Sequence, residues 1–167
     1  QAQGDAAAAM TRFRESAALA KRAAAPALQA KSSLGAAGIL LASGGDAVEA
    51  QALIEQAWAA ISGLPSSRSK AWLMLGNANK LQELAAVSSN SSEALLVVAK
   101  RLQAAAELAD SLGDARTASH AYGTLGALYE QQGQYPEALS LTDTAVFMTQ
   151  QVWPKMVELL GAQPYNP

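Results

Sequence analysis

Apolar residues recur along most of this chain at steps of three and four, which is the spacing of one face of an α-helix. One clear example follows Asp46, where the face is formed by Ala47, Ala50, Leu53, Ile54, Ala57 and Ile61. No stretch alternates apolar and polar residues in the manner of a β-strand. Alanine, the strongest helix former, is clustered at 6–9, 23–25 and 104–106. The pattern therefore predicts an all-α protein.

Proline, glycine and runs of polar residues divide this pattern into segments. Pro26 interrupts a first helix, Asp46 is placed to cap a helix after a glycine turn, Asp114 is a further candidate cap, and a serine-rich break covers 88–92. We predict a single helical domain over 1–167. Its parts are an N-terminal helix at 5–25, a weak hairpin at 28–62, a long hairpin at 69–113, a hairpin at 117–151 and the start of a further helix at 153–160.

The hairpin at 117–151 has the most informative pattern. One helical face contains Tyr122, Leu125, Gly126 and Tyr129. Gly126 has no side chain, so a second helix can pack against its backbone. Gly133 can take the left-handed conformation that ends a helix, and Pro136 suits the first turn of the next one. The second helix offers a small and apolar face made of Ala138, Leu141 and Ala145.

This order of residues resembles the tetratricopeptide repeat (TPR), with departures at Thr142, where a large aromatic is usual, and at Gln150, where a proline is usual. Leu34-Gly35 and Leu75-Gly76 repeat part of the pattern. The resemblance implies a right-handed superhelical solenoid of about three antiparallel hairpins plus an N-terminal helix. The segment 107–151 is also loosely similar to the TPR arrays that precede CHAT peptidase-like domains in bacterial proteins.

In TPR proteins, the first helices of the hairpins line a concave groove for a partner protein or peptide. The register of the resemblance places these residues in the groove: Lys70, Leu73, Asn77, Lys80 and Leu81; His120, Gly123, Ala127, Glu130 and Gln131; and Gln29, Ser32, Ala36 and Ile39. Lys70, Asn77 and Lys80 are expected to form a polar and basic strip on one helix, able to hold a carboxylate or backbone carbonyls. The alternative for each groove residue is a solvated face without a dedicated ligand. The aromatic residues Trp72, Tyr122, Tyr129 and Tyr135 are predicted to pack in the core or between hairpins, and not to stack on a ligand.

Composition and charge narrow the chemistry. A net charge of −2 argues against nucleic acid or anionic lipid as a partner, and the longest apolar run, 34–42, is too short to cross a bilayer. The chain has no cysteine and one histidine, His120, whose neighbours Ser119 and Asp114 lie too close in sequence to converge on it as a catalytic set. We expect no enzyme activity, no cofactor and no metal site.

The expected function is a non-catalytic scaffold that binds a protein or peptide through its concave face. The alternative is a regulatory or sensing segment of a larger bacterial enzyme, such as a CHAT peptidase-like protein. Self-association through the ends of the solenoid is a third hypothesis. Because the sequence begins at Gln1, export to the periplasm or the exterior is favoured over a cytoplasmic location.

Overall fold

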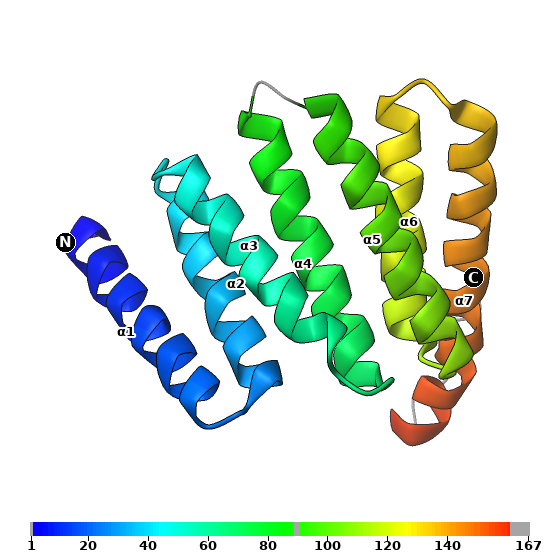
Figure 1. Cartoon of the computed structure of the whole chain (residues 1–167). Coiled ribbons are helices and arrows are strands. Elements are labelled where there is room, and N and C mark those ends of the chain that lie inside the picture. The colour runs from blue at the N-terminus through cyan, green and yellow to red at the C-terminus, as the bar shows by residue number, and fades with distance from the viewer. Residues whose placement is uncertain (1, 89–90, 161–167) are drawn as a thin grey trace.

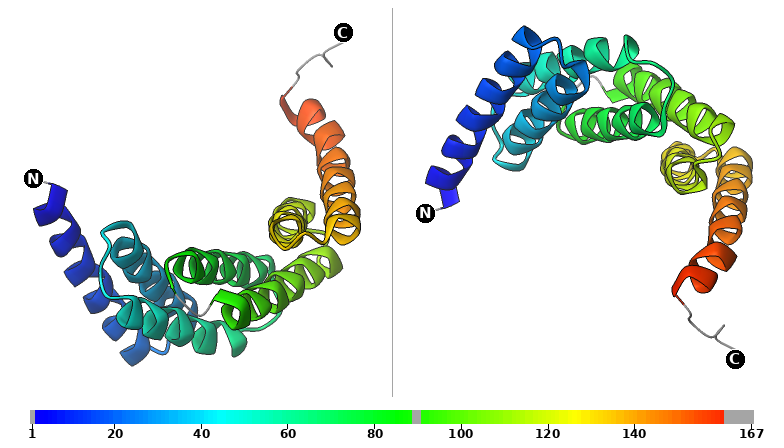
Figure 2. Two further views of the ribbon diagram at one scale, coloured as in Figure 1. Left: turned by 90° about the horizontal axis from the view of Figure 1, so that it is seen from above. Right: turned by 90° about the horizontal axis from the view of Figure 1, so that it is seen from below.

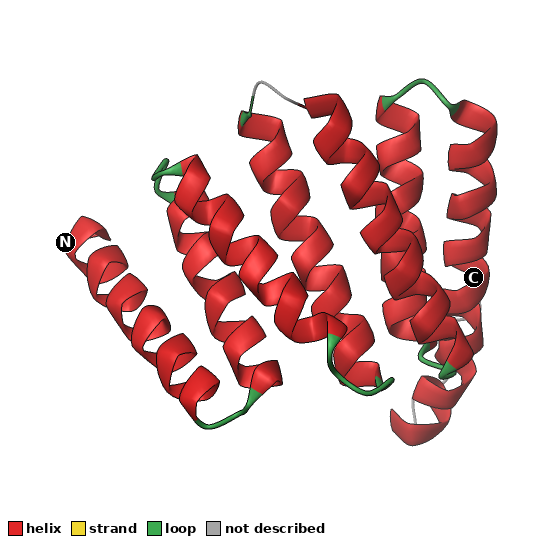
Figure 3. Ribbon diagram, in the orientation of Figure 1, coloured by secondary structure: helices red, strands yellow, loops and turns green. Residues whose placement is uncertain are grey.

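The computed structural model of the chain describes residues 2–88 and 91–160, and these residues form seven α-helices without a β-strand (Figure 3). Side chains are described for 6–88 and 93–150. The helices are α1 (Ala2–Arg22), α2 (Pro26–Ala42), α3 (Ala47–Ser62), α4 (Arg68–Val87), α5 (Ser91–Ser111), α6 (Ala115–Gln131) and α7 (Tyr135–Leu160). The predicted all-α class is confirmed.

The helices are arranged as a curved stack in which consecutive helices run antiparallel and pack side by side (Figure 1). Packing also joins α2 to α4 and α4 to α6. Viewed along the helices, the stack forms an arc, with α2, α4 and α6 on its inner side and α3 and α5 on its outer side (Figure 2). The helices α1 and α7 form the two ends of the arc. We call the surface formed by α2, α4 and α6 the inner face.

The helix ends follow the predicted local chemistry. Asp46 caps α3 by accepting hydrogen bonds from the backbone N–H groups of Val48 and Glu49, at 2.8 and 3.4 Å. Asp114 caps α6 in the same way, accepting from the backbone N–H of Thr117 at 3.3 Å. After α6 the chain turns at Gly133, whose φ of 73° is one that a residue with a Cβ rarely adopts. This turn brings α7 back along α6.

Alanine dominates the interior. More than half of the buried apolar side chains are alanines, and the largest fully buried apolar ones are Ile54, Ile61, Leu75, Val98 and Leu102. These residues form one continuous cluster from α2 to α6. A methyl side chain lets helix backbones approach closely, so the core is formed by contact between helices more than by bulky side chains.

The prediction of a separate helix that starts at residue 153 is wrong. Those residues are the last part of α7, which continues through Pro154 to Leu160. The proline that usually closes a TPR hairpin is replaced by Gln150, and no glycine or proline stands at that position to end the helix. Residues 161–167 lie outside the described part of the chain.

The three Leu-Gly pairs lie in different packing environments. A Cβ on Gly126 would lie 2.9 Å from Thr142 Oγ1 and 3.2 Å from the Ala138 carbonyl oxygen, so Gly126 faces α7, the next helix, as predicted. A Cβ on Gly35 would instead meet the ring of Phe13 on α1, the preceding helix. For Gly76 the nearest contact is Leu34 of α2, at 3.9 Å. The same dipeptide therefore faces the next helix only in α6.

Candidate binding site on the inner face

The predicted strip of Lys70, Asn77 and Lys80 does not exist as one surface. The Lys70 ammonium donates to the carbonyl oxygens of Ser62 and Leu64, at 3.2 and 2.7 Å, and so holds the end of α3. The Asn77 side chain is fully buried, and its Nδ2 donates to the Ile54 carbonyl oxygen at 2.8 Å. Asn77 is therefore inaccessible to a partner, and its prediction as a groove residue is wrong.

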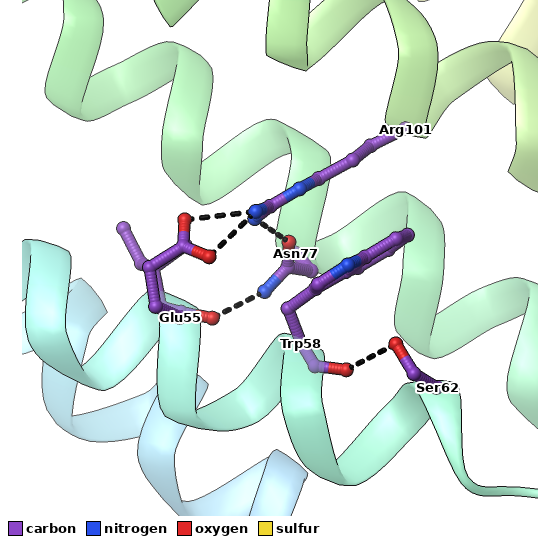
Figure 4. Close-up of polar contacts among 6 residues, drawn as sticks. Glu55, Trp58, Ser62, Asn77 and Arg101 are labelled. Atoms are coloured by element: carbon purple, nitrogen blue, oxygen red, sulfur yellow. Dashed lines mark hydrogen bonds and ion pairs between the residues drawn. The ribbon is translucent and has the colours of Figure 1, made fainter.

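Asn77 belongs to a polar cluster that joins three helices (Figure 4). The guanidinium of Arg101, on α5, donates to Asn77 Oδ1 on α4 at 2.7 Å and to both carboxylate oxygens of Glu55 on α3 at 2.7 and 2.8 Å. It also lies over the ring of Trp58, 4.5 Å from the centroid, as a cation–π contact. Only 6% of Arg101 is exposed. The cluster holds α3, α4 and α5 together.

This cluster was missed from sequence, although α5 contains a signal for it. Arg101 follows Val98 by three residues and precedes Ala105 by four, so its charge falls on the buried face of that helix. A charged side chain on such a face needs a polar partner. The sequence does not say which one, because Asn77 and Glu55 are 24 and 46 residues away.

Other predicted groove positions are buried, half-buried or engaged in contacts within the chain. Leu73 and Leu81 are buried in the core, and Lys80 forms an ion pair with Glu83 on its own helix, with Nζ 2.7 Å from Oε2. On α2, Ala36 is buried, and Ser32 Oγ lies 2.8 Å from Ser16 Oγ of α1. Gln29 and Ile39 are half-buried.

A rotated register explains these errors. The TPR register assumes that the glycine of each Leu-Gly pair faces the second helix of its own hairpin. Gly35 faces α1 and Gly76 faces α2, so both helices are turned about their axes relative to that assumption. Each of these residues stays on a helix as predicted, but Asn77 and Ser32 point into the stack.

The predicted positions on α6 are at the surface. His120, Ala127, Glu130 and Gln131 are exposed, and Gly123 is half-buried. The residues His120, Gly123 and Ala127 line a depression of about 880 Å³ between α6 and α7. Here a Cβ on Gly126 would meet Ala138, Leu141 and Thr142 of the next helix, which is the packing that the register assumes.

Trp72 is the main inner-face residue that the sequence did not predict. It was predicted to pack in the core or between hairpins; it does contact His120 of the next hairpin, but 50% of it is exposed. Its ring stacks on the ring of His120, with centroids 6.3 Å apart and planes inclined by 28°. The two residues come from α4 and α6, so this pair links the first helices of two neighbouring hairpins on the inner face. Of the other aromatic residues, Tyr122 and Tyr129 do pack against the core, whereas Tyr135 is exposed.

Trp72 also lines a second depression, of about 630 Å³, between the first turns of α2, α4 and α6. Each helix contributes one basic side chain to it: Lys31 from α2, Arg68 from α4 and Arg116 from α6. Arg116 also lines the depression between α6 and α7, so the two hollows are adjacent. We call the first of them the basic depression. The N-terminal turns of three helices add partial positive charge to the same region.

The groups near His120 are engaged in structural contacts. Asp114 accepts the cap hydrogen bonds, including one from Thr117 Oγ1 at 2.7 Å, and Ser119 Oγ donates to the Ala145 carbonyl oxygen at 2.8 Å. Within the described residues, no hydrogen bond links the His120 ring to Ser119 or Asp114, and no group of three acidic or histidine side chains could hold a metal ion. The hydrogen bonds of Asp114 and Ser119 are therefore made to groups other than the His120 ring.

One titratable group on α6 has a shifted pKa. Burial raises the pKa of Tyr122 above its ordinary value of 10.0, and the negative charges of Asp110 and Glu107 raise this pKa further. The phenol therefore stays neutral, in keeping with its packing against the core.

No protein-family model matches the chain, and no curated protein is significantly similar to it. Among the described helices, none is both long and apolar enough to span a membrane.

Proposed function

We propose that this chain is a TPR-like helical repeat module, a right-handed superhelical solenoid that binds a partner protein or peptide through its inner face without catalysing a reaction. The solenoid assignment is supported by the α6–α7 hairpin, where Gly126 packs on Ala138 and Thr142 of the next helix. It is also supported by the inner and outer rows of helices along the arc (Figure 2). A concave surface of this kind is how repeat proteins contact extended ligands.

The observation that carries the proposal is the half-exposed Trp72 beside His120, between two hollows of the inner face. An indole exposed to water retains a large apolar area that a ligand can cover, and tryptophan is enriched among the residues that dominate binding energy at interfaces. Here the Trp72 ring lies against the His120 ring, with centroids 6.3 Å apart, and this contact narrows the choice of indole rotamers before a ligand binds.

A library selection with NMR mapping tests this function. Displayed random peptides would be selected on the wild-type chain alone and then measured for binding to Trp72→Ala, which changes a half-exposed side chain outside the buried core. The selected peptides would then be titrated into isotope-labelled protein. We expect amide shift changes on α2, α4 and α6. Changes confined to α3 and α5, or selected peptides that bind Trp72→Ala equally well, would refute inner-face binding.

A further inference from the structure

We propose that the basic depression recognises an acidic linear peptide segment, whose carboxylates contact Lys31, Arg68 and Arg116 while an apolar side chain lies on Trp72. This inference rests on the proposed function and specifies the chemistry of the partner. It replaces the strip of Lys70, Asn77 and Lys80 with a site formed by three helices.

The charges of the depression argue for an anionic ligand. Lys31, Arg68 and Arg116 are exposed, and within the described residues none of them forms an ion pair. The acidic residue of the lining, Asp114, is held by the backbone and the hydroxyl of Thr117 at the start of α6. The depression is thus positive on a chain whose net charge is −2. Two arginines and a lysine offer charge-assisted hydrogen bonds to carboxylates.

The remaining lining argues for a peptide with an apolar residue beside its acids. Trp72 and Leu28 are each half-exposed, and both border the hollow. A depression of about 630 Å³ has room for a few side chains of an extended segment, but not for a folded domain. An aromatic and an aliphatic surface next to three cations therefore match a segment that mixes carboxylates with one apolar anchor.

Single-stranded nucleic acid is the competing polyanion, since bases also stack on tryptophan. Proteins that bind it use a basic groove that follows the backbone over several nucleotides. Here the three cations are gathered around one hollow. The depression between α6 and α7 continues from it with small and hydroxyl-bearing side chains: Ser119, Gly123, Thr124, Ala127, Ala145 and Thr149. This arrangement favours the peptide.

An array of dodecapeptides tests the inference. The peptides form matched pairs that differ only in having Asp and Glu or Asn and Gln, and each carries one leucine or phenylalanine at a varied position. The best pair, labelled with fluorescein, is titrated with protein by fluorescence anisotropy. We expect the acidic member to bind at least about tenfold more tightly than its amide counterpart, and this ratio to shrink as salt is raised.

Charge reversals locate the binding. Arg68→Glu combined with Arg116→Glu should weaken binding of the acidic peptide about tenfold or more, because attraction becomes repulsion. The matched control, with the same change in net charge, is Lys100→Glu combined with Arg12→Glu; these are exposed cations on α5 and α1 outside the depression, and their reversal should change the affinity less than about twofold. Unchanged far-UV circular dichroism melting shows that each variant is folded.

The alternative outcomes separate this inference from the proposed function. If acidic and amide peptides bind equally and Trp72→Ala abolishes both, the acidic preference is overturned while inner-face binding stands. If an oligothymidylate probe of similar length competes more strongly than the acidic peptide, the ligand is nucleic acid and the inference fails. If no array peptide binds, the inference fails as well, and the library selection decides the proposed function by itself.

Discussion

Two glycines on α6 provide a sharp test of the helix packing. Gly123 and Gly126 lie on the same helix three residues apart, and both are replaced by alanine in the experiment. Each substitution gains about 1 kcal/mol in helix propensity, since alanine loses less backbone entropy than glycine. The two variants therefore differ only in the space that the new methyl group finds.

That space is very different at the two positions. At Gly123 a Cβ would lie 3.8 Å from Ala145 Cβ, an ordinary van der Waals contact. At Gly126 it would lie 2.9 Å from Thr142 Oγ1 and 3.2 Å from the Ala138 carbonyl oxygen. Those two atoms are hydrogen-bonded to each other at 2.8 Å, so neither can move without breaking that contact. Overpacking of this kind costs about 1–3 kcal/mol.

The net effects should therefore have opposite signs. We expect Gly123→Ala to raise the free energy of unfolding by about 1 kcal/mol and Gly126→Ala to lower it by about 1 kcal/mol. Gly126→Leu should lower it by about 3 kcal/mol. Adding Thr142→Ala to Gly126→Ala removes the closer contact, so the double variant should regain about 1 kcal/mol relative to the sum of the single changes.

Urea unfolding followed by far-UV circular dichroism measures these differences. If Gly126→Ala stabilises the chain as much as Gly123→Ala, the close approach of α6 and α7 at this glycine is wrong. A double variant whose effect is the sum of the single ones would show that Thr142 is not the residue that limits the space.

Three further changes test other contacts, each read by urea unfolding. Arg101→Met should lower the free energy of unfolding by about 2–3 kcal/mol because it leaves Asn77 Oδ1 buried without its donor. Glu55→Gln should lower it by at most about 1 kcal/mol because that carboxylate is half-exposed. Equal effects of the two variants would contradict the proposed role of the cluster. Asp46→Ala should lower the free energy of unfolding by about 1 kcal/mol because α3 loses its cap, and Asp46→Asn should lower it much less. If the Asn variant is destabilised as much as the Ala variant, the side chain does not cap the helix. Because the pKa of Tyr122 in the folded chain lies above 10.0, the unfolded chain releases this phenol proton first, and the free energy of unfolding should fall as pH rises above 10.0. Tyr122→Phe should make that fall shallower, and an unchanged slope would refute the raised pKa.

The features that could be predicted from the sequence are those that depend on residues close together in the chain. The caps at Asp46 and Asp114 and the turn at Gly133 depend on residues within a few positions, and each has its predicted role. The all-α class follows from periodicity over the whole chain. These predictions needed no knowledge of how one helix lies against another.

The inner face could not be predicted because it depends on helix rotation. A glycine in a helix shows that something approaches closely, but not what approaches. For Gly35 the neighbour is Phe13, which lies 22 positions earlier, and for Gly76 it is Leu34, 42 positions earlier. These distant contacts go with an orientation of α2 and α4 in which Asn77 is buried and Trp72 is half-exposed. On α6 the neighbour is the next helix, so the predicted surface residues there are in place.

The alanine-rich interior has a consequence for how this protein tolerates sequence change. A buried alanine has only a methyl group to lose, so replacement by glycine removes one small contact and adds backbone freedom to the unfolded chain, whereas any larger residue must push two helices apart. Truncation can create a sizeable void only at the larger buried positions, such as Ile54, Ile61 and Leu102. In a saturation mutagenesis scan, gain of volume should therefore be the dominant route to inactivation along the helix contacts. Over evolution, we expect the buried alanine positions at these contacts to change only among glycine, alanine and serine. The exposed faces of the same helices remain free to vary.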